Sequence, residues 1–111
     1  MMDSCALLVV DLQPVYCDTV DDPTYPPKVQ KILTHMRSNL SADRIVHVRA
    51  NYEKSPMSLH RILNPIVKYP IEKDVGAVEW AKELGGEPVF QKSTIDGFVD
   101  TSLAEYLSSR S

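Results

Sequence analysis

The sequence has little of several features that mark particular classes of protein. Only two of its 111 residues are cysteines, Cys5 and Cys17. They lack the paired spacing of a zinc site and are too few for a disulfide scaffold. Only four residues are glycine, and the first apolar segment is followed by Asp-Leu-Gln-Pro rather than by a glycine-rich phosphate-binding loop. We therefore expect a protein of a reducing compartment, and the cytoplasm is the predicted location.

Excess basic charge and long apolar runs are also missing. The net charge is −3, and the lysines and arginines are scattered along the chain, so there is no basic surface of the kind that binds nucleic acid. The first apolar run extends only from Cys5 to Val10 before Asp11 interrupts it. That run is too short for a secretory signal or a membrane span. We expect neither nucleic acid nor a membrane as a partner.

The composition is that of one ordinary globular domain. Hydrophobic residues make up 43% and charged residues 24% of the chain, which favours a packed core over disorder. The length suits a single domain over residues 1–111.

Residues 13–25 hold three aspartates and two prolines and are predicted to form an irregular, solvated loop. The alternate-position oxygen ligands of a calcium loop are absent there.

Strand and helix patterns alternate along the chain. Short apolar or β-branched segments predict three strands, namely Cys5–Val10, Ile45–Ala50 and Val89–Phe90, the last ending at Gln91-Lys92. Apolar spacing or end signals predict three helices: residues 29–40 after Pro26-Pro27, residues 77–84 before Gly85-Gly86, and a last helix capped by Thr101 with Leu103, Tyr106 and Leu107 inside. This alternation predicts an α/β fold with a parallel sheet.

Residues 51–74 separate the second strand from the next helix. They contain three prolines and only a weak helical pattern over residues 59–66. Excursions of this length inside a compact domain are often binding loops, although an ill-packed insertion is the alternative.

Polar residues follow the first and third predicted strands. Asp11 comes directly after the first strand, and Lys92 ends the third. Because ligands of parallel sheets bind beyond the carboxyl ends of the strands, both side chains are predicted to lie at one rim. A carboxylate there accepts a proton while an ammonium stabilises an anion. The alternative is an ion pair that only locks two strand ends together. His47 is expected to be a packed or hydrogen-bonded residue of the second strand.

Two blocks of sequence resemble the isochorismatase-like cysteine hydrolases, which include nicotinamidases and related amidohydrolases. "LLVVDLQPVYC" matches a strand that ends in Asp-x-Gln and an aromatic residue, here Asp11, Gln13 and Tyr16. "GGEPVFQKSTIDGFVDTSLAEYL" matches a lysine after a short strand, followed by a phenylalanine, a threonine and a leucine before a helix. These residues are Lys92, Phe98, Thr101 and Leu103. The resemblance is strong at the two ends of the chain and slight in the middle.

This resemblance implies an Asp-Lys-Cys triad acting on a small amide, vinyl-ether or related substrate. Asp11 would be the general base, Lys92 the charge stabiliser, and Gln13 and Tyr16 would bind substrate. Neither cysteine fits the nucleophile, because Cys17 lies on the loop after Asp11 and Cys5 opens the first strand, where we expect it to be packed. No cofactor is expected. No metal is expected either, since residues 47–56 lack the Asp-x-His pair of the metal-binding members.

A competing class is the phosphohydrolases that use an aspartate nucleophile after a similar strand. That class needs a second acid two residues further on, where this chain has Gln13.

The resemblance also implies a Rossmann-like, three-layer α/β/α fold with six strands and the first strand near the centre. Only about three strands are predicted here, so residues 1–111 are expected to be a domain that lacks its C-terminal portion. The chain would then be a fragment, a truncated product or a subunit completed by another chain. The first strand would expose an unpaired edge, so the isolated chain should be marginally stable and without hydrolytic activity. The alternative is a non-catalytic interaction module that pairs through this edge, with a homo-oligomer as one outcome.

Overall fold

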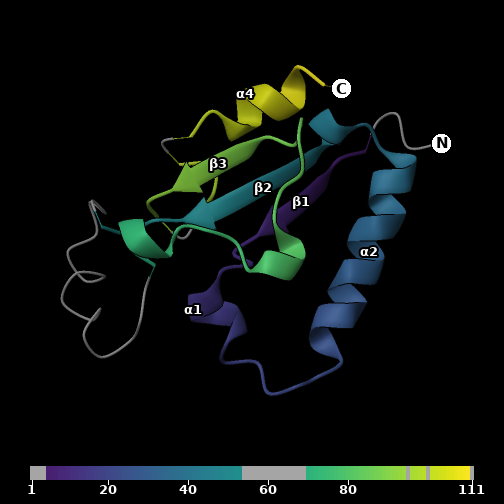
Figure 1. Cartoon of the computed structure of the whole chain (residues 1–111). Helices are drawn as coiled ribbons and strands as arrows, with labels where there is room; N and C mark the ends of the chain where they lie inside the picture. Colours follow the sequence, from purple (N-terminus) through teal and green to yellow (C-terminus); the bar gives the residue numbers. More distant parts are fainter. Residues whose placement is uncertain (1–4, 54–69, 95, 100, 111) are drawn as a thin grey trace.

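A parallel sheet forms the centre of the molecule. The computed structural model describes residues 5–53, 70–94, 96–99 and 101–110. Within them the strands β1 (Leu7–Val10), β2 (Ile45–Ala50) and β3 (Val89–Lys92) lie side by side in that order (Figure 1). Val10 pairs with Val48, and Ala50 pairs with Lys92. The predicted parallel α/β sheet is confirmed, and β2 is its central described strand.

Helices cover both faces of the sheet. On one face, Leu33 and Met36 of α2 (Tyr25–Asn39) pack with Val9 and Ile45. On the other face, Leu103 of α4 (Leu103–Ser108) packs with two valines of β2. Figure 1 shows α4 beyond β3, on the opposite side of the sheet from α2. The arrangement is the three-layer α/β/α fold that the sequence predicts.

Every residue of β2 is buried, although two of them are ionisable. The Nε2 atom of His47 lies 2.8 Å from Glu87 Oε1, and Arg49 pairs with Glu83. These acids come from the segment that leads into β3. Buried polar side chains need such partners because an unpaired one loses its hydration without compensation. The predicted role of His47 as a hydrogen-bonded strand residue is therefore confirmed.

The outer side of β1 is apolar and partly bare. Leu8 is 37% and Val10 46% exposed, and Ile32 of α2 is 55% exposed. A groove of about 220 Å³ runs between the strand and the helix. Among the described residues, no strand pairs with this side of β1. Ile32 belongs to the predicted buried stripe of α2, and it is exposed because it faces this groove.

The predicted helix over residues 77–84 is wrong. Only a 3-10 turn, Glu79–Ala81, forms there. The N–H of Val78 donates to the carbonyl of Leu12, and the guanidinium of Arg37 donates to the carbonyl of Lys82. Both partners lie far away in the sequence, so tertiary contacts rather than the local helical pattern set the path of this segment. Gly86 still serves the turn before β3, with a φ of 88°.

Three smaller expectations also need correction. The predicted irregular loop after Asp11 contains a short helix, α1 (Pro14–Cys17), because proline suits a first helical turn. Cys5 is exposed rather than packed. Ser102, not Thr101, occupies the N-cap position of α4 but makes no side-chain cap bond, while the Thr101 hydroxyl donates to the carbonyl of Gly97 and accepts from the N–H of Leu103 at 3.4 Å. Two further 3-10 turns are Ala42–Arg44 and Glu72–Asp74.

Some expectations lie beyond what the structure describes. The weak helical pattern over residues 59–66 falls outside the described residues. Within the described part of the chain, no helix has the length and apolar character needed to cross a bilayer. The cytoplasmic location stays a prediction.

Candidate active site

Asp11 ends β1 by turning the backbone away from the sheet. Its N–H still donates to the carbonyl of Val48 at 2.9 Å, as the next residue of the strand would. Its φ is then 60°, the only positive value among the described residues other than glycine. Aspartate tolerates this left-handed conformation better than most side chains do. The acid therefore stands at the carboxyl end of β1, where the chain leaves the core.

Lys92 reaches Asp11 across the end of β2. Its Nζ lies 3.1 Å from Asp11 Oδ2, and the side chains of Lys92 and Asp11 are 6% and 29% exposed. A Cβ added at Gly97 would lie 4.0 Å from Lys92 Cδ, so the backbone of Gly97 passes near the lysine stem. Because β1 and β3 flank β2, the two side chains meet only at a shared rim. The predicted proximity is confirmed, while the catalytic roles of both residues stay predictions.

The second carboxylate oxygen of Asp11 is differently placed. Oδ1 is buried and accepts no hydrogen bond from the residues that the structure describes. A buried acceptor without a donor is costly.

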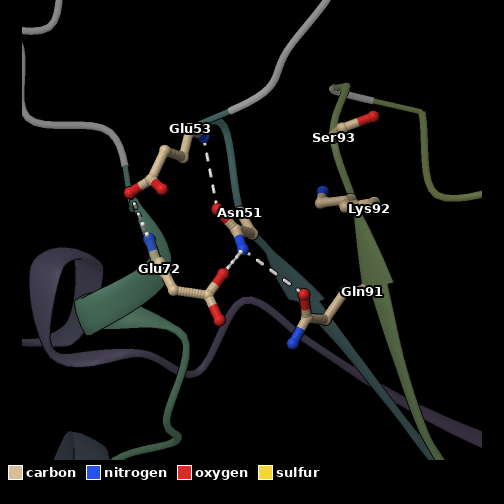
Figure 2. A pocket seen from close by; sticks show the side chains of 6 residues that line it. All are labelled: Asn51, Glu53, Glu72, Gln91, Lys92 and Ser93. Atoms are coloured by element: carbon tan, nitrogen blue, oxygen red, sulfur yellow. Dashed lines mark hydrogen bonds between the residues drawn. The ribbon is translucent and has the colours of Figure 1, made fainter.

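A polar pocket of about 310 Å³ opens beside Lys92. Figure 2 shows Lys92 and Ser93 on one side of it, with the carboxylates of Glu53 and Glu72 opposite. Its lining also includes Asn51 and Gln91. The size suits a small molecule. The two acids give the wall opposite the lysine a negative charge.

Hydrogen bonds hold that wall together. Asn51 Nδ2 donates to Glu72 Oε2 at 2.6 Å, and the N–H of Glu53 donates to Asn51 Oδ1 at 3.2 Å. The N–H of Glu72 donates to Glu53 Oε1 at 3.3 Å. These three residues come from the two described ends of the predicted binding loop, residues 51–74. The sequence pattern marked that loop but did not single out these three residues. A signal for Asn51 was present, because it directly follows β2 at the rim where Lys92 ends β3.

Gln13 is not among the residues that line the pocket. It is fully buried, and its side-chain amide bonds to the backbone of Ala50 and Asp74. Tyr16 is half-buried in α1. Substrate binding by Gln13 and Tyr16 stays a prediction.

Neither cysteine has the environment of an activated nucleophile. Burial, followed by the nearby charge of Asp18, raises the pKa of the Cys17 thiol. Cys17 packs against the core between β1 and α2. Cys5 precedes β1, at the opposite end of the strand from Asp11. A thiolate is the nucleophilic form of cysteine, and the environment of Cys17 disfavours it.

No metal centre is evident in the described part of the chain. No three His, Cys, Asp or Glu side chains of these residues converge on one point. Whether the whole chain needs a metal or cofactor stays a matter of prediction.

Searches by sequence give no match, whereas searches by structure give several. No protein-family profile matches the chain, and no curated protein matches it significantly. A cysteine hydrolase from Pseudomonas syringae has a TM-score of 0.73 at 20% identity, covering 99% of this chain and 56% of its own. An isochorismatase-like hydrolase from Alkaliphilus metalliredigens has a TM-score of 0.69 at 23% identity, covering 98% and 61%.

A third similar structure is the N-carbamoylsarcosine amidase from Thermoplasma acidophilum, with a TM-score of 0.65 at 23% identity, covering 94% of this chain and 60% of its own. This chain therefore has the fold of the isochorismatase-like hydrolases and spans little more than half the length of these structures.

Proposed function

We propose that this chain supplies the acid and the lysine of an isochorismatase-like hydrolase site for a small amide, vinyl-ether or related substrate. One observation carries the proposal, namely Lys92 Nζ at 3.1 Å from one oxygen of Asp11 while the other oxygen has no donor among the described residues. A pocket of small-molecule size adjoins Lys92, and Asp11 is not among the residues that line it. The presence of an amidase among the similar structures favours an amide substrate.

The proposed chemistry uses a cysteine thiol supplied from outside this chain. The thiol gives its proton to Asp11, and the thiolate attacks the carbonyl carbon of the substrate. Lys92 stabilises the developing negative charge. The C–N bond then breaks, the departing nitrogen takes the proton back from Asp11, and water hydrolyses the thioester. Because neither Cys5 nor Cys17 fits the nucleophile, the chain alone should not turn substrate over.

A panel of small amides and vinyl ethers tests this proposal. The chain alone should show no turnover above buffer, whereas a small added thiol such as mercaptoethanol should restore some acyl transfer. That rescue should be lost in Asp11→Asn and in Lys92→Met, but kept in Lys28→Met, which changes an exposed lysine of α2. Strong turnover that survives Asp11→Asn would defeat both the assigned roles and the predicted inactivity.

A second candidate function is a non-catalytic interaction module. The observation that favours it is the bare side of β1, where Leu8, Val10 and Ile32 are exposed along an apolar groove. An open strand edge is a template for pairing, and two copies related by a two-fold axis would pair their β1 strands. Concentration-dependent association of the pure chain, abolished by Val10→Lys, would favour this function. A monomer at all concentrations would count against it.

A further inference from the structure

Ala50 has a backbone partner that is not a strand residue. Within β2, Val48 and Ala50 direct their backbone groups toward β1. His47 and the next residue after the strand, Asn51, instead donate their N–H groups to the carbonyls of Pro88 and Lys92. The ladder with β1 ends at the bond from the N–H of Asp11 to Val48, because Asp11 turns the chain away. Ala50 is fully buried, so its N–H and C=O would be left without partners or water.

The side chain of Gln13 fills that position. Its Oε1 accepts from the N–H of Ala50 at 2.8 Å, and its Nε2 donates to the carbonyl of Ala50 at 2.9 Å. A glutamine amide offers one donor and one acceptor side by side, as a peptide group does. The side chain thus continues the ladder for one more residue while the main chain has already left it.

Gln13 also holds the pocket wall. The Nε2 atom donates to the carbonyl of Asp74 at 2.9 Å, so one amide group joins β2 to the Glu72–Asp74 turn. Glu72, on that turn, lines the pocket beside Lys92. Ala50 itself pairs with Lys92 across the sheet. The amide of Gln13 therefore joins the strand residue that pairs with Lys92 to the turn that carries Glu72.

We infer that Gln13 is a positioning residue, whose side-chain amide fixes Asp11, Lys92 and the Glu72 wall relative to one another by replacing a missing strand residue. The inference rests on the proposed function only in that it concerns the same two residues, Asp11 and Lys92. Glutamate has the same shape but loses the amide donors when ionised. Asparagine keeps them on a side chain one methylene shorter.

The accessibility of Lys92 reports this positioning. In Gln13→Glu, the acetylation rate of Lys92, normalised to exposed Lys28 and read by peptide mass spectrometry, should rise about tenfold, the change expected when a typical net hydrogen bond is lost from a local opening. The matched control is Val46→Ala, which perturbs the core at the other end of β2. The two variants are compared under conditions in which their unfolding free energies are equal. Under those conditions Val46→Ala should leave the acetylation rate of Lys92 unchanged.

Two results would overturn the inference. One is an unchanged Lys92 rate in Gln13→Glu, and the other is an equal rise in Val46→Ala, which would mean a general loss of stability. If Gln13→Glu does not fold, the wild-type chain gives the answer. Exchange of the Ala50 amide and acetylation of Lys92 should depend equally on low urea, and labelling of Lys92 while Ala50 stays protected would refute the coupling. These measurements need no substrate, so their failure leaves the proposed hydrolase untouched.

Discussion

Glu87 is the acid whose removal should have the largest effect on stability. Its side chain is 2% exposed and accepts hydrogen bonds from Arg37 Nε at 2.7 Å, from Arg37 Nη2 at 2.9 Å and from the N–H of Leu84 at 3.0 Å. His47 Nε2 lies 2.8 Å away. Burial alone would raise the pKa of Glu87, but these bonds and the charge of Arg37 lower it from 4.5 to about 2.

That difference sets the magnitude of the prediction. At about 1.4 kcal/mol per pKa unit, the ionised form contributes about 3 kcal/mol to folding, against a total of about 5–15 kcal/mol for a typical domain. Because the pKa is lower in the folded state, this stability is complete above about pH 4.5 and is lost as the pH falls toward 2. Glu87→Gln should therefore lose about 3 kcal/mol at pH 7.

Urea unfolding of both proteins between pH 7 and pH 2.5 is the assay. The gap between wild type and Glu87→Gln should narrow steadily below pH 4.5, because protonation then removes the same charge from the wild type. The control is Glu105→Gln, which changes an exposed acid of α4. A gap that stays constant down to pH 2.5 would show that Glu87 does not act through its charge.

Three further predictions concern other parts of the chain. Gly86→Ala should lower the unfolding free energy by about 1 kcal/mol or more, because φ is 88° and the new Cβ would lie 3.1 Å from Ala42 Cβ; Gly85→Ala, in open space, should cost less in the same urea titration. Cys17 should react with iodoacetamide more slowly than free glutathione at pH 8, because its pKa is raised and less thiolate is present; a faster reaction would contradict the assigned environment. Val10→Lys should lower any self-association without destabilising the chain, because Val10 is 46% exposed; sedimentation and urea unfolding test the two parts.

The meeting of Asp11 and Lys92 was predictable because it needs only two local patterns and one general rule. A buried strand before each residue gives parallel strands, and parallel strands end at the same rim. The distance of 3.1 Å between Lys92 Nζ and Asp11 Oδ2 confirms that step. The strand over Ile45–Ala50 was equally clear, since its β-branched pattern has no competing helical period.

What sequence reasoning missed depends on contacts between distant segments. The segment over residues 77–84 is not a helix, and its backbone bonds instead to Leu12 and to the side chain of Arg37. Nothing local in that segment signals such partners. Glu53 and Glu72 line the pocket only because the path of the chain brings the ends of residues 51–74 together. The Gln13 side chain takes the place of a strand residue because the chain turns away at Asp11. That turn depends on backbone conformation rather than on any pattern of residue types.

The turn at Asp11 decides which substitutions test its chemistry cleanly. With φ at 60°, a side chain at this position bears a steric cost that glycine avoids and asparagine bears easily. Asp11→Asn removes the charge alone, Asp11→Gly removes charge and strain, and Asp11→Ala removes the charge while keeping the strain. In urea unfolding, Asp11→Ala should be about 1 kcal/mol less stable than Asp11→Gly, although alanine is the better residue in an unstrained chain. Equal stability of the two would mean that the backbone at Asp11 is not held in this conformation, and that Gln13 has no gap in the ladder to fill.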